Sequence, residues 1–75
     1  MPYFIFKVWR ASGELELLRR VETPPLSEAD SYRRAEAMLR EARRAANPAD
    51  GYYVHLAFGE DEREACLKLR AQLGE

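Results

Sequence analysis

The chain has 75 residues, with 12 basic and 13 acidic side chains and a formal net charge of −1. Such a length gives one small domain spanning residues 1–75, and such a charge gives no overall attraction to nucleic acid or acidic lipid. One cysteine and one histidine make neither a disulfide nor a zinc site, and no apolar run approaches a membrane span, so we expect a cytoplasmic protein without metal or other cofactor.

The first predicted element is a strand over residues 3–10. Successive side chains of a strand alternate between its two faces. One face therefore carries Phe4, Phe6 and Val8, and the other carries Tyr3, Ile5, Lys7 and Trp9. Both faces of this strand are apolar or aromatic, which is the feature on which the functional hypothesis below depends.

A second strand is predicted over residues 15–22, joined to the first by a hairpin. A two-residue tip at Ser12-Gly13 would set Val8 opposite Leu17, and would set Phe4 opposite Val21 on the same face. This register turns Arg19 toward the inner side. We therefore expect the second strand to lie at a sheet edge, or to contain a bulge near Arg19.

A helix is predicted over residues 28–46, after prolines 24 and 25 have ended the second strand. Its apolar stripe recurs at helical spacing and consists of Tyr32, Ala35, Leu39, Ala42 and Ala46. The opposite face is rich in arginine, with Glu36 and Glu41 interleaved. Ser27 with Asp30, or Asp30 and Ser31 directly, can cap the first turn.

The last two elements are a strand over 52–58 and a helix over 61–73. The strand places Tyr53 and His55 opposite Val54, Leu56 and Phe58. The helix begins at Asp61, whose side chain we expect to cap the first turn. Its inner stripe is Ala65, Cys66, Leu69 and Leu73.

The resulting order, ββαβα, predicts an α+β fold with a three-stranded antiparallel sheet. The first strand is the most apolar, so we favour strand order 2-1-3 over 1-2-3. We expect both helices to pack on one face of the sheet, leaving the other face uncovered. The predicted core is Phe4, Phe6, Val8, Leu17, Tyr32, Ala35, Leu39, Val54, Leu56, Phe58 and Leu69.

Four segments carry a resemblance to other sequences: residues 4–6, residues 15–18, residues 30–35, and residues 54–58 leading to Glu64-Ala65. Over most of its length the chain resembles a family of small, uncharacterised bacterial proteins with the ββαβα order. A bacterial source also agrees with ten arginines against two lysines, which indicate a GC-rich gene. The resemblance implies a fold and no assigned activity.

Residues with reactive side chains have simpler structural interpretations. His55 has a pKa range suited to acid–base chemistry, but no nucleophile or orienting carboxylate is evident, so we interpret it as a packing residue. Cys66 is interpreted as a core or interface thiol. The acidic residues 60–64 suit a helix N-terminus and lack a calcium-loop pattern. We therefore expect a protein that is not an enzyme and has no catalytic residues.

The uncovered face is the predicted contact surface, formed by Tyr3, Ile5, Trp9, Leu18, Tyr53 and His55. Trp and Tyr supply large contact areas, and the balanced charges nearby suit a protein partner. We expect a homo-oligomer, such as a homodimer, or a complex with another protein. Single-stranded nucleic acid stacking on the aromatic rings is the alternative, and small-ligand binding is a weaker one. The arginine-rich face of the predicted helix is an alternative candidate for the functional contact surface.

Overall fold

The computed structural model describes residues 2–21 and 28–74, so the predicted cap at Ser27 and prolines 24 and 25 lie outside the described residues. Five main elements follow one another along the chain, with a short 3₁₀ turn, η1, at Pro48–Asp50. Their bounds are β1 Tyr3–Trp9, β2 Leu15–Val21, α1 Glu28–Ala45, β3 Tyr52–Phe58 and α2 Glu62–Gln72. These bounds confirm the predicted ββαβα order.

The three strands form one antiparallel sheet in the order β2-β1-β3. The central position of β1 follows from its composition, because a strand paired on both sides and covered on both faces must be apolar throughout. Phe4, Ile5 and Phe6 are all at most 1% exposed. The predicted strand order 2-1-3 is confirmed, and β2 and β3 are the two edges.

The hairpin register differs from the predicted one. The loop spans residues 10–13, because the Gly13 N–H donates to the Trp9 carbonyl at 2.7 Å, and Gly13 adopts a left-handed φ of 73°. The register then shifts between Ile5 and Phe6, which confirms a bulge in this part of β2. The bulge turns Leu17 and Val21 to opposite faces, so the predicted pairing of both with one face is wrong.

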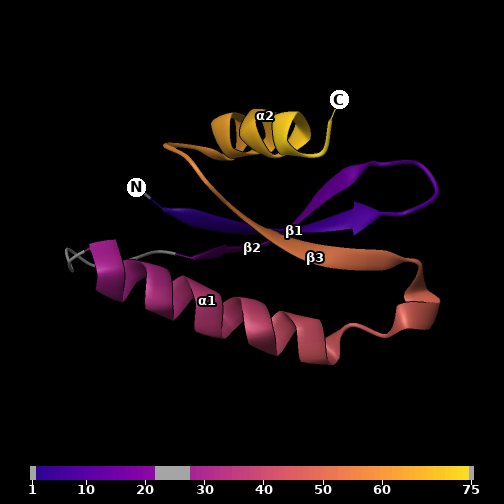
Figure 1. Cartoon of the computed structure of the whole chain (residues 1–75), viewed down its shortest axis with the longest axis horizontal. Coiled ribbons are helices and arrows are strands. Elements are labelled where there is room, and N and C mark those ends of the chain that lie inside the picture. The colour runs from indigo at the N-terminus through magenta and orange to yellow at the C-terminus, as the bar shows by residue number, and fades with distance from the viewer. Residues whose placement is uncertain (1, 22–27, 75) are drawn as a thin grey trace.

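The two helices lie on opposite faces of the sheet (Figure 1). Phe4 and Phe6 pack with Ala65 and Leu69 of α2, whereas the intervening Ile5 packs with residues of α1. The prediction that both helices cover one face is therefore wrong. The physical reason is that β1 is apolar on both faces, and each face needs a cover of its own to exclude water.

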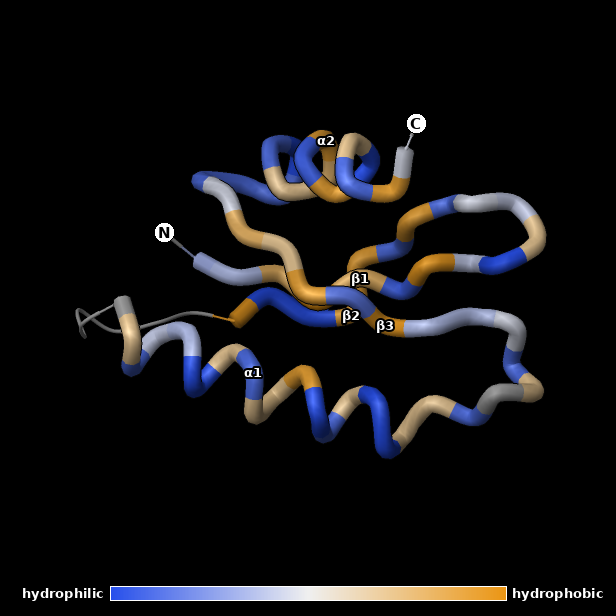
Figure 2. Tube along the Cα trace, in the orientation of Figure 1, coloured by the Kyte–Doolittle hydropathy of each residue, from blue (hydrophilic) through white to orange (hydrophobic). Residues whose placement is uncertain are grey.

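The core is accordingly divided into two layers by the sheet. The α1 layer contains Ile5, Val21, Ala35, Leu39 and Val54, and the α2 layer contains Phe4, Phe6, Ala57, Ala65 and Leu69. Figure 2 shows α1 alternating between hydrophobic and hydrophilic segments along its turns, as expected for a helix with one face on a sheet.

Seven of the predicted core residues are buried, and four are not. Phe4, Phe6, Val8, Ala35, Leu39, Val54 and Leu69 are buried. Tyr32 and Phe58 are instead 47% and 48% exposed, and Leu17 and Leu56 are half-buried. Ile5, Val21, Ala57 and Ala65 are buried residues that the predicted core did not include.

Candidate functional site

The six residues of the predicted contact surface do not form one surface. Tyr3, Ile5, Trp9 and Leu18 lie on the side of α1, whereas Tyr53 and His55 lie on the side of α2. Ile5 is fully buried beneath α1. The antiparallel register explains the division, because Phe6 pairs with His55 and paired residues share a face. The continuous aromatic face expected for a partner or for stacked bases is therefore absent from the described residues.

Trp9, the centre of the predicted surface, is engaged within the protein. Its ring lies 5.2 Å from that of Tyr52, and the Lys7 ammonium lies 4.7 Å from the centre of the Tyr52 ring. Lys7 in turn lies 3.8 Å from a carboxylate oxygen of Glu16. This group joins all three strands at one end of the sheet, and its contacts give Trp9 a structural role.

The reactive side chains also make structural contacts. The His55 Nδ1 lies 3.1 Å from the backbone oxygen of Leu56, and Cys66 is half-buried against the α2 layer of the core. Asp61 caps α2 as predicted, accepting a hydrogen bond from the Glu64 N–H at 2.8 Å. Residues 2–21 and 28–74 contain no group of three or more His, Cys, Asp or Glu residues that could hold a metal ion. The absence of catalysis stays a prediction.

The structure draws attention instead to the open edge of β3. The Arg10 N–H donates to the Gly51 carbonyl at one end of the β1–β3 ladder, and the Gly59 N–H donates to the Pro2 carbonyl at the other. Hydrogen-bonded positions alternate along an antiparallel strand, so the odd-numbered residues of β3 pair with β1. The backbone groups of Tyr52, Val54, Leu56 and Phe58 therefore point away from the sheet.

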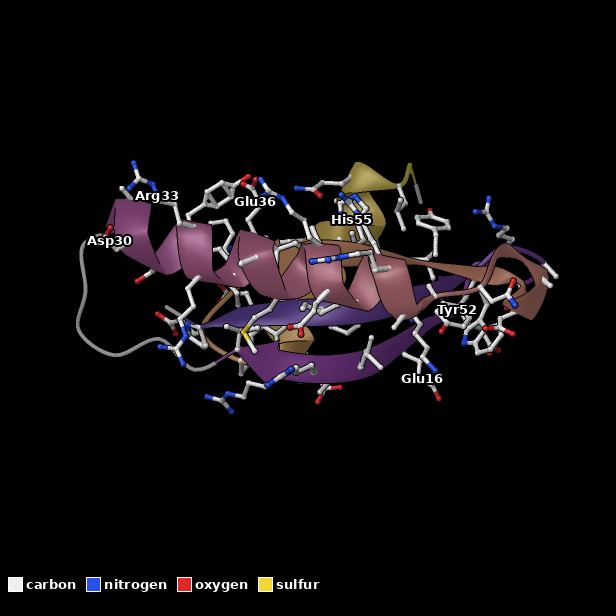
Figure 3. The ribbon with its side chains drawn as sticks, turned by 90° about the horizontal axis from the view of Figure 1, so that it is seen from below. Glu16, Asp30, Arg33, Glu36, Tyr52 and His55 are labelled. Atoms are coloured by element: carbon white, nitrogen blue, oxygen red, sulfur yellow. The ribbon has the colours of Figure 1, made fainter. Side chains whose placement is uncertain are left out.

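Both helices flank this edge. Each helix makes its most extensive contact with the sheet at β3, one on each face. Between them lies a groove of about 460 Å³, which we call the β3 groove. Its floor is residues 55–58, and its walls include Tyr32, Glu36, Arg40 and Arg43 of α1 and Lys68 and Gln72 of α2. In Figure 3, Glu36 and His55 lie along this edge of the molecule, and Glu16 of β2 lies at the opposite one.

An aromatic cluster closes one end of the β3 groove. The Tyr3 ring lies 6.3 Å from the ring of Tyr32 and 6.0 Å from the ring of Phe58. The Lys68 ammonium lies 4.5 Å from the centre of the Phe58 ring. Tyr32 and Phe58, which were predicted to be in the core, are thus half-exposed at the mouth of the groove.

The other end of the β3 groove continues into a smaller hollow of about 280 Å³ beside Tyr52 and Val54. Arg43 lines both spaces, and Arg10 contributes to the smaller one, with its guanidinium 5.1 Å from the Tyr53 ring centre. Val54, between them, is only 3% exposed. The edge is therefore open at Leu56 and Phe58 and covered by side chains at Val54.

The lining of these two spaces is basic. Among the described residues that line them, Arg10, Arg40, Arg43 and Lys68 are basic and Glu36 is the one acidic residue. Glu36 accepts a hydrogen bond from Arg40 at 2.6 Å, and Lys68 lies 3.0 Å from Glu64. Arg43 has no carboxylate in ion-pair range within the described part of the chain. The groove thus carries positive charge although the whole chain does not.

The sequence contains one signal for this site that the predicted contact surface does not include. Strand order 2-1-3 already makes β3 an edge strand, and its seven residues include no lysine, arginine, glutamate, aspartate or proline. The position of the groove could not be predicted from the sequence, because the groove forms only when the two helices lie on opposite faces of the sheet.

Comparison with known proteins gives no relative. The chain matches no family model, no curated protein and no solved structure. The resemblance to a small bacterial family stays a prediction. No helix in the described ranges is both long enough and apolar enough to cross a membrane.

Proposed function

We propose that this protein is a non-enzymatic interaction module that binds a protein partner through the open edge of β3. The observation that supports this proposal is the contrast between its two edges. β2 carries Glu16, Arg19, Arg20 and a bulge, which are the devices that keep an edge from pairing. β3 has no charged residue and no bulge, and its outward backbone groups lie at the floor of a groove.

Strand addition is the binding mode that uses such an edge. A partner strand forms main-chain hydrogen bonds with the outward groups, and the walls of the groove select its side chains. The groove volume of about 460 Å³ also falls in the range of small-molecule sites. Its floor of outward backbone donors and acceptors, however, is matched best by another peptide chain.

The proposal predicts that the outward N–H of Leu56 is needed for binding. A chain of 75 residues is within reach of chemical synthesis, so the Leu56 nitrogen can be methylated. This change removes one donor and blocks the edge, while the β1–β3 ladder and the leucine side chain remain. We expect the methylated protein to fold and to lose the partner that the unmodified protein captures.

The control is methylation of the Leu15 nitrogen. Leu15 is also half-buried, and its N–H points out from the β2 edge, because the neighbouring Glu14 bonds Trp9 in the β1–β2 hairpin. Circular dichroism establishes folding, and quantitative mass spectrometry compares the captured proteins. Equal capture by the Leu56-methylated and Leu15-methylated proteins would contradict the proposal.

A further inference from the structure

We infer that the segment added to β3 belongs to another protein, is extended, and alternates acidic with apolar residues. This inference rests on the proposed function and names the partner's chemistry. Side chains of an added strand alternate between the two faces of the sheet. Those that point to the α1 side meet Arg40 and Arg43. Those that point to the α2 side meet Lys68 and Gln72 above the buried Ala57 and Leu69. The Lys68 ammonium is already paired with Glu64 at 3.0 Å, so an apolar side chain can pack on the methylene groups of this wall.

The spacing of the two arginines suits a strand. Arg40 and Arg43 are three residues apart in α1, which is about 4.5 Å along the helix axis. Residues on one face of a strand repeat at about 6.6 Å. Two successive acidic side chains of the partner can therefore each reach one guanidinium, since arginine side chains are long and flexible. Carboxylates are the natural partners of this group.

Arg43 is the residue best placed to bind a carboxylate along the whole edge. It lines both hollows on either side of Val54. A partner strand that pairs along all of β3 therefore passes beside its side chain. A carboxylate of the partner can pair with Arg43 there, because Arg43 has no ion-pair partner in the described part of the chain.

A second copy of the chain fits this edge poorly. Each copy would bring its own α1 and α2, and both helices pack chiefly on β3. Paired strands lie about 4.8 Å apart, whereas packed helices need about 8–10 Å between their axes. Two basic grooves would also face each other. A partner strand without flanking helices avoids both conflicts.

A nucleic acid matches the charge of the groove but not its floor. The outward edge of Phe58 presents an N–H donor and a carbonyl acceptor together, and Leu56 presents its N–H. The Leu56 carbonyl lies 3.1 Å from the His55 Nδ1 and keeps a second lone pair for a further hydrogen bond. A peptide backbone has both complementary groups at the same spacing, whereas phosphate oxygens are acceptors only. The backbone edge therefore favours an acidic peptide over a polyanion.

The test uses a peptide of seven residues, the length of β3, that alternates glutamate with valine and is blocked at both ends. Binding to the whole protein is followed by two-dimensional NMR of the backbone amides. We expect saturable shifts at residues 54–58, and no binding by the matched peptide of lysine and valine. Arg43→Gln should weaken binding about two- to fivefold, the effect of one exposed ion pair.

Two further variants test whether the effect on binding is specific to the residues that line the groove. Arg44→Gln makes the same charge change in the same turn of α1 at a residue outside the groove lining, and should leave affinity unchanged. Glu36→Gln removes the carboxylate that competes for Arg40, and should strengthen binding by a similar factor. All three positions are at least partly exposed, so the variants should remain folded.

Each contrary outcome overturns the inference. Failure of the glutamate peptide to bind at millimolar concentration would do so, as would equal binding of the lysine peptide or equal binding to the Leu56-methylated protein. Tighter binding of oligothymidine at the same amides would identify a nucleic acid as the occupant. A sedimentation mass near twice 8.7 kDa that returns to 8.7 kDa on Leu56 methylation would identify a second copy. If Leu56 methylation still abolishes capture of a partner protein, the proposed function stands without this inference.

Discussion

At the scale of single residues, Gly59 determines how closely α2 approaches the end of β3. A Cβ at this position would lie 2.8 Å from the backbone nitrogen of Ala65, closer than real side chains come to backbone. Ala65 is fully buried against the α2 layer of the core, so the helix has no room to withdraw. Gly59 therefore keeps α2 beside β3 and keeps the α2 wall of the β3 groove in place.

Gly59→Ala should consequently destabilise the protein by about 1–3 kcal/mol, the usual range for overpacking. Gly51→Ala is the control. Gly51 has a left-handed φ of 81° with no atom near its added Cβ, so its cost is backbone strain alone, about 1–2 kcal/mol. Urea unfolding measures both values. A Gly59→Ala variant as stable as the unmodified protein would contradict the close approach.

At the scale of elements, β1 decides the architecture because it is buried on both faces. Phe4 and Phe6 face α2, while Ile5 between them faces α1 with no exposed surface. A strand of this kind cannot leave one face to the solvent without losing the free energy of burying it. The two helices accordingly divide between the faces.

This division predicts a large cost for Ile5→Ala. Removing a fully buried isoleucine side chain should lower the free energy of unfolding by about 2–5 kcal/mol, as should Phe6→Ala on the other face. Leu18→Ala on β2 should cost much less, because Leu18 is 43% exposed. Thermal and urea unfolding compare the three variants. If Ile5→Ala behaved like Leu18→Ala, the α1 face of the sheet would be uncovered.

Local sequence patterns predict the helices and strands well, but they predict less well how these elements pack against one another. Alternation in residues 3–9 and 52–58, helical spacing in α1, and the Asp61 cap were sufficient for the element order and strand order. Alternation shows which residues of a strand share a face, but not which face a helix covers. The β1–β3 register, which sets Phe6 beside His55, has no local signal. The inward Arg19 did indicate the bulge in β2, but not that the bulge separates Leu17 from Val21.

At the scale of the whole molecule, the two sheet edges are unequal. The β2 edge is charged and bulged, whereas the β3 edge is uncharged and lies in a basic groove between the two helices. Covering both sheet faces uses both helices, and this leaves β3 as the place where the fold presents unpaired backbone. We propose that this edge is open in the free protein and pairs with a partner strand.

Amide hydrogen exchange of β3 tests this claim most directly. In the free protein, the Leu56 and Phe58 amides should exchange much faster than those of His55 and Ala57, which bond β1. With the glutamate–valine peptide bound, the Leu56 and Phe58 amides should become protected while the other two stay unchanged. Equal protection of all four amides in the free protein, or exchange at Leu56 that the bound peptide leaves as fast as before, would contradict the account.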